Sequence, residues 1–120
     1  MISLSAFAVV EPFRGEFIDI KPATYPNTIN LRSRGVTPVA VLTTHWFDAM
    51  DVDPDTVKFA SAAPKKYNQE DVDGDGDLDL IFHFRTRKLD LNSNSTSAAL
   101  AGKTDAGTAS CGKDTVEIEP

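Results

Sequence analysis

The stretch "EDVDGDGDLDLIFHF", Glu70 to Phe84, joins an acidic loop directly to an apolar run. Aspartate occupies every second position from 71 to 79. In the run that follows, one set of alternate residues is apolar: Leu78, Leu80, Phe82 and Phe84. The intervening positions are Asp79, Ile81 and His83. This two-residue period predicts a β-strand over residues 78–85 with one face toward a core.

Shorter segments of the same kind lie on both sides, separated by residues that favour turns. We expect further strands at 16–22, 28–33, 36–44, 56–60, 98–104 and 115–119. We expect loops or turns at 24–28, 51–55, 61–70, 91–97 and 105–114. A single helical turn is predicted at 45–50, with Thr44 as its cap. The pattern predicts an all-β, single-domain β-sandwich, Ig-like or jelly-roll-like, with one short helical turn.

Length and charge limit the classes of protein that fit. A chain of 120 residues is long enough for one core. The net charge of −6 argues against nucleic-acid binding, which needs a basic face. No apolar run is long enough to span a membrane. Cys111 is the single cysteine, so it either bridges two chains or, as we favour, remains a partly buried free thiol.

The N-terminal segment "MISLSAFAVVEP" also alternates with the period of a strand. The residues of its apolar face are Ile2, Leu4, Ala6, Ala8 and Val10. The small residues Ala6 and Ala8 leave a second interpretation, the tail of a signal peptide. We favour the strand. The expected organisation is an N-terminal strand or appendage at 1–12, followed by a β-sandwich domain at 13–120 that carries the aspartates.

The aspartates predict a metal site, because carboxylates so close together repel one another unless a cation lies between them. Calcium accepts six to eight oxygen ligands in flexible geometry, whereas zinc favours His and Cys. Gly76 falls at the sixth position from Asp71, where a sharp turn needs a residue without Cβ. The expected metal residues are Asp71, Asp73, Asp75, Asp77 and Asp79. Magnesium and a solvated acidic turn without metal are the alternatives.

The spacing D-x-D-x-D-G-x-x-D, running into a strand, resembles the calcium loops of integrin-type FG-GAP propeller blades. It departs from the EF-hand, because Phe82 stands where a closing Glu would be needed. The resemblance implies that calcium is held by four side chains and by the backbone carbonyl of Asp77. Those side chains are Asp71, Asp73, Asp75 and Asp79.

Two further groups of residues have a functional and a plain structural interpretation. A second acidic cluster, Asp48, Asp51, Asp53 and Asp55, forms either another metal site or an ordinary capped turn, which we favour. The aromatic residues Tyr25, Trp46, Phe47 and Tyr67 could form a sugar-stacking platform. We favour instead that Trp46 and Phe47 fill the core.

No catalytic residues are predicted. His45, His83 and Cys111 are too few for a nucleophilic triad, and no nucleophile motif surrounds the cysteine. The carboxylates that could act as an acid–base pair are already assigned to the metal. We therefore expect a protein that is not an enzyme.

Three motifs in order, "FIDIKPATYPNTINLRSRGVTPVAVLTT", "FDAMDVDPDTVKFA" and "EDVDGDGDLDLIFHFRT", resemble an uncharacterised β-domain of secreted bacterial and archaeal proteins. The resemblance covers about residues 17–119. It implies a calcium-bound, β-rich domain located outside the cell or at its surface, and it implies no activity.

The function expected from these features is that of an extracellular structural subunit. Its copies would form a homo-oligomer or polymer, such as a filament or surface layer, by adding residues 1–10 as a strand to a neighbouring sheet. The alternative is a carbohydrate-binding module, with polysaccharide as partner, or a spacer module of a larger secreted protein.

Overall fold

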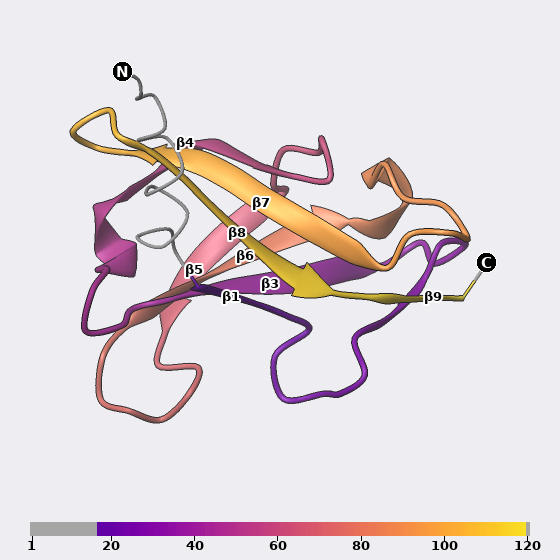
Figure 1. The fold of residues 1–120 in the computed structure, drawn as a ribbon, viewed down its shortest axis with the longest axis horizontal. Coiled ribbons are helices and arrows are strands. Elements are labelled where there is room, and N and C mark those ends of the chain that lie inside the picture. Colours follow the sequence, from indigo (N-terminus) through magenta and orange to yellow (C-terminus); the bar gives the residue numbers. More distant parts are fainter. Residues whose placement is uncertain (1–16, 120) are drawn as a thin grey trace, which may run out of the picture.

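The computed structural model describes residues 17–119 (Figure 1). The chain is all-β, as predicted, with two short 3-10 helices. The first five strands are β1 (Phe17–Ile20), β2 (Thr28–Asn30), β3 (Val36–Leu42), β4 (Val52–Phe59) and β5 (Lys66–Glu70). The later strands are β6 (Asp79–Arg85), β7 (Ser97–Thr104), β8 (Ala109–Thr115) and β9 (Glu117–Glu119). The helices are η3 (Ala49–Asp51), before β4, and η4 (Thr86–Lys88), after β6.

Two antiparallel sheets face each other. One has the strand order β1-β3-β6-β5 and the other β4-β7-β8, while β2 and β9 form a small parallel pair. Buried apolar side chains from both larger sheets form one core. The rings of Phe59 on β4 and Phe84 on β6 meet across it with centroids 5.2 Å apart. The arrangement is a β-sandwich, as the short alternating segments predict.

The decisive strand, β6, lies in the middle of the four-stranded sheet between β3 and β5. Leu80, Phe82 and Phe84 belong to the core, whereas Ile81 and His83 are on the opposite face. The predicted alternation of this strand is therefore confirmed. Its register against β3 places Phe82 opposite Val39 and Leu80 opposite Val41, so both strands direct their apolar face inward.

Two strands were predicted wrongly as loop or turn. β5 has five exposed residues, so it carries no hydrophobic alternation to reveal it; hydrogen bonding to β6 alone makes it a strand. β8 pairs with β7 but alternates only between exposed and half-buried positions with small residues. In both cases the segment is a strand because it pairs with a neighbouring strand, and its own hydrophobic pattern does not predict this.

The acidic turn expected at 51–55 is also corrected, because Asp51 ends η3 and residues 52–55 begin strand β4. The pairing of β4 with β7 shifts register between Asp53 and Lys58, so the residues around Pro54 form an irregularity within the strand. The helical turn starts later than predicted, at Ala49, and Asp48 caps it by accepting from the Met50 N–H. Thr44 instead forms an isolated bridge with Phe47.

The expected N-terminal strand, with Ile2, Leu4, Ala6, Ala8 and Val10, lies outside the described residues. Within residues 17–119, none of the helices has the length and apolar character needed to cross a membrane. Cys111 is exposed on β8, so the prediction of a partly buried thiol is wrong: it lies on the outer face of the three-stranded sheet.

Candidate metal centre

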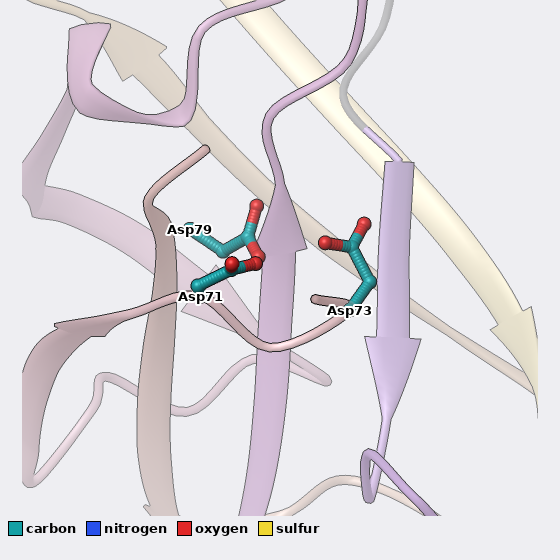
Figure 2. Close-up of side chains that lie close together, drawn as sticks. All are labelled: Asp71, Asp73 and Asp79. Atoms are coloured by element: carbon teal, nitrogen blue, oxygen red, sulfur yellow. The ribbon is translucent and has the colours of Figure 1, made fainter. Parts of the chain in front are cut away.

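The aspartate loop, residues 71–78, connects β5 to β6 at one end of the four-stranded sheet. Carboxylate oxygens of Asp71, Asp73 and Asp79 all lie within 4.8 Å of one another. Figure 2 shows the three side chains turned toward a shared space, Asp71 and Asp73 from the loop and Asp79 from the start of β6. Three carboxylates converging in this way can hold a metal ion.

Asp79 is the buried member of the group. Its side chain is 0% exposed, although it is a carboxylate. Its Oδ1 accepts a hydrogen bond from the Thr43 N–H at 2.8 Å, and its Oδ2 accepts one from the Val72 N–H at 2.8 Å. These bonds offset the cost of burying the polar group and hold both oxygens in place. Each oxygen retains a lone pair for a cation.

Thr43 connects Asp79 to the neighbouring segments through hydrogen bonds. Its hydroxyl donates to the Leu78 carbonyl at 2.6 Å and accepts from the Ala49 N–H at 2.9 Å. The end of β3, the aspartate loop and η3 are therefore connected through one side chain. Sequence reasoning did not identify Thr43, because a threonine that follows a strand carries no signal until the partner segments are in place.

Asp71 organises the loop itself. Its Oδ1 accepts from the Gly74 N–H at 2.9 Å and its Oδ2 from the Gly76 N–H at 3.0 Å. Both glycines have positive φ, +73° and +94°, which permits the chain to wrap around the carboxylate. The predicted sharp turn at Gly76 is confirmed.

Asp73 shows the electrostatic conflict within the loop. Although its side chain is exposed, its pKa is raised by desolvation, by the side-chain contact with Asp75 and by the nearby charges of Asp79 and Asp75, while a backbone hydrogen bond opposes the shift. The ionised form is thus disfavoured in the folded chain. A cation among the three carboxylates would remove this penalty.

The carboxylates of Asp75 and Asp77 are not part of the group of three. Asp75 instead accepts from the Asp77 N–H at 2.9 Å. All donors in the group are carboxylate oxygens, a set that suits a hard cation. In the part of the chain from 17 to 119, this is the one group of acidic, His or Cys side chains close enough to hold a metal.

In the second acidic cluster, Asp48 caps a turn, as we favoured, whereas Asp53 and Asp55 lie within strand β4. Asp48 accepts from the Met50 N–H, and Asp53 accepts from the Asp55 N–H at 3.1 Å. The cluster therefore satisfies backbone donors around η3 and the start of β4.

The aromatic residues do not form one platform. Tyr25 is 86% exposed after β1, Trp46 is 79% exposed after β3, and these antiparallel strands place the two residues at opposite ends of the sheet. Tyr67 is on the edge strand β5, with its ring 5.7 Å from that of Phe82. Phe47 packs against the core as expected, but the prediction that Trp46 does so is wrong.

Comparison with protein-family models, curated proteins and solved structures finds no match.

Proposed function

We propose that this protein is a non-enzymatic, extracellular, calcium-binding structural subunit that assembles with copies of itself. The observation that carries the calcium assignment is the convergence of Asp71 and Asp73 on the buried Asp79. Calcium suits this group because it accepts several oxygens in flexible geometry, whereas magnesium requires a nearly ideal octahedron and retains water. Following the resemblance to FG-GAP loops, Asp75 and the Asp77 carbonyl complete the set once the ion binds.

The bound ion would stabilise the fold. It links the aspartate loop to β6 through Asp79, and Asp79 is already bonded to the residue that follows β3. A ligand that binds only the folded chain at 100 times its dissociation constant adds about 2.7 kcal/mol to the free energy of unfolding. Millimolar extracellular calcium is enough to fill even a weak site.

Thermal unfolding of the metal-free full chain, with and without 5 mM calcium, tests this assignment. We expect calcium to raise the melting temperature by several degrees, magnesium at the same concentration to raise it less, and added chelator to reverse the shift. A melting temperature that changes with neither calcium nor chelator would contradict the assignment.

The assembly proposal is supported by an open sheet edge. β5 is the outer strand of the four-stranded sheet, and all five of its residues are exposed. Such an edge presents unpaired backbone groups to which an incoming strand can bond. The apolar alternation of residues 2–10 fits a donor strand for this edge in a second copy. Contacts of this head-to-tail kind build filaments when the rotation between copies does not close.

Light scattering of the full chain, first with calcium and then with excess chelator, tests the assembly. We expect large particles that shrink on chelation, and we expect a chain lacking residues 1–10 to remain a folded, calcium-binding monomer. A reducing agent keeps the exposed Cys111 from bridging chains. Assembly that continues without residues 1–10 would overturn strand addition.

The exposure of Trp46 favours a second candidate, a carbohydrate-binding module. Its ring packs edge-on against His45, with centroids 4.7 Å apart, three residues beyond Thr43. An exposed aromatic face could stack on a sugar. This candidate predicts that polysaccharide retards the protein in an affinity gel and that Trp46→Ala abolishes the retardation. Equal mobility with and without polysaccharide would exclude it.

A further inference from the structure

Positive charge gathers at the end of the sandwich opposite the aspartate loop. Six cationic residues lie there: Arg34, Lys65, Lys66, Arg85, Arg87 and Lys88. The segments that carry them are joined by backbone hydrogen bonds, from the Lys65 N–H to the His83 carbonyl and from the Thr86 N–H to the Gly35 carbonyl. All six are exposed. We call this surface the basic end.

A pocket opens within the basic end. It has a volume of about 320 Å³, and its charged lining residues are Lys65, Arg85 and Lys88, with no acidic residue among the lining. Ser61, which has a positive φ of 68°, also lines the pocket. Asp90, whose N–H bonds to the Ala60 carbonyl, and Glu119 also lie near this end, and the six cations outnumber them. The pocket is large enough to receive a carboxylate side chain.

The other end of the same strands is acidic. The four exposed aspartates of the aspartate loop lie at the same end of the sandwich as the exposed Asp48, Asp51 and Asp105 (Figure 1), and we call these residues together the acidic end. The Asp105 N–H bonds to the Asp51 carbonyl at 2.8 Å, which joins the β7–β8 turn to η3. Figure 1 shows η3 and the β7–β8 and β5–β6 connections at the left, and the β2–β3 connection and the segment after β6 at the right. A bound calcium ion offsets only part of the negative charge.

We infer that the basic end of one copy docks on the acidic end of a second copy. The two charge sets lie at opposite ends of the strands, so each copy presents both halves of a complementary pair. This contact is heterologous, because different surfaces meet, and it can therefore extend along the strand direction without closing. The inference deepens the proposed assembly function, but its surfaces are the charged ends and not residues 1–10.

A second copy fits better than a free polyanion. The net charge of −6 repels a polyanion and a second copy alike, and this overall repulsion is screened beyond about 10 Å at 0.1 M salt, so the charges that meet at the contact decide the partner. The acidic end of another copy has the charge opposite to that of the basic end. Because every copy carries both ends, the two are present at the same concentration. The cations of the pocket have no ion-pair partner among the described residues, so they need not break an internal pair to dock.

Two charge-reversed full-length variants test the contact. The basic-end variant is Lys65→Glu/Lys88→Glu, and the acidic-end variant is Asp51→Lys/Asp105→Lys. None of these four side chains makes a hydrogen bond within residues 17–119, so the fold should tolerate each change. Both variants leave the three converging carboxylates intact. Sedimentation is measured with saturating calcium and reducing agent, at low and at high salt.

We expect each variant alone to associate at least tenfold more weakly than the unmodified chain at low salt. An equimolar mixture of the two variants should recover the association, because each supplies the end that matches the other. High salt should weaken the association of the unmodified chain and of the mixture. The matched control for the basic-end variant is Lys58→Glu/Lys113→Glu on the outer face of the three-stranded sheet, which changes the net charge by the same amount and should associate normally.

Mixed variants that associate no better than the separate ones would overturn the inference. So would a basic-end variant that loses binding to heparin while its self-association stays unchanged, since the basic end would then serve a polyanion. Particles that survive charge reversal and disappear on deletion of residues 1–10 would leave the proposed strand addition standing and reject charge docking. Recovery in the mixture together with assembly of the deleted chain would support docking and reject strand addition.

Discussion

Asp79 combines two roles that are usually separated, because it is both a buried structural acceptor and a member of the candidate metal group. Its two oxygens receive the N–H groups of Thr43 and Val72, and its side chain has no exposed surface. A buried carboxylate with good acceptor geometry is stable only while its partners are held in place. Changes at Asp79 should therefore affect the fold and the ion together.

We expect Asp79→Asn to reduce calcium affinity by at least tenfold and to lower the metal-free unfolding free energy by about 1–3 kcal/mol, since the amide group cannot accept both N–H bonds. Calorimetric titration measures the first effect and urea unfolding the second. Asp55→Asn is the control, because that exposed residue lies outside the metal group. Unchanged calcium affinity in Asp79→Asn would remove Asp79 from the site.

His83 is a residue whose charge should affect stability. On the outer face of the sheet its pKa is lowered, first by burial and then by the charges of Lys66 and Lys65, while Glu70 opposes the shift. Its Nε2 is 3.0 Å from the Asn68 Oδ1. The folded chain thus binds the His83 proton less tightly than the unfolded chain does.

The stability contribution of neutral His83 is therefore complete above its ordinary pKa of 6.5 and is lost as the pH falls below that value. We expect the melting temperature of His83→Gln to fall less between pH 7 and pH 5 than that of the unmodified chain. His45→Gln, at an exposed position, is the matched control variant. Parallel melting curves for His83→Gln and the unmodified chain across this range would contradict the prediction.

The element that positions the site is the aspartate loop, and its shape depends on backbone conformation. Gly76 has φ +94°, and a Cβ added there would meet no atom within 4 Å. Gly107, in the β7–β8 turn, has φ +88° and equally open surroundings. Substitution at either glycine therefore costs backbone strain alone, without a steric clash.

We expect Gly76→Ala and Gly107→Ala each to destabilise the fold by about 1–2 kcal/mol. Only Gly76→Ala should also weaken calcium binding, because its N–H bonds to the Asp71 Oδ2 and sets the position of that carboxylate. Urea unfolding and calcium titration of both variants separate the two effects. If Gly76→Ala and Gly107→Ala bound calcium with equal affinity, the turn at Gly76 would not be needed for calcium binding.

The local sequence predicted some strands and missed others. β6 was predictable because it packs one face on a core, which imposes strict alternation. The acidic pattern also predicted Asp71, Asp73 and Asp79, since all three come from nine consecutive residues. β5 could not be predicted, because its order comes from pairing with β6 while its side chains remain in water.

Across the whole molecule, the two sheets are joined at one side by a carboxylate. Asp114 on β8 accepts from the Ile20 N–H at 3.1 Å and from the buried Asn27 side chain at 3.0 Å. The Asn27 amide also donates to the Thr115 carbonyl. Burial, followed by the charge of Asp114, raises the pKa of the neighbouring Asp19. This contact closes the side of the sandwich between β1 and β8.

We expect Asp114→Ala to reduce the unfolding free energy by about 2–3 kcal/mol, because it leaves the Ile20 N–H and part of the Asn27 amide without an acceptor. The exposed Asp105→Ala should change it by less than about 0.5 kcal/mol. Urea unfolding at pH 7 compares them. A cost for Asp114→Ala no larger than that of the control would mean that water replaces the lost acceptor.

The sequence by itself determined the all-β class, the central strand and the group of aspartates, because each depends on residues close together in the chain. Only the tertiary structure decided that Thr43 supports Asp79, that Trp46 is exposed, and that the cations collect opposite the acidic end. These features arise where segments distant in sequence meet. Their energies come from pairing and burial between segments, which no single segment encodes.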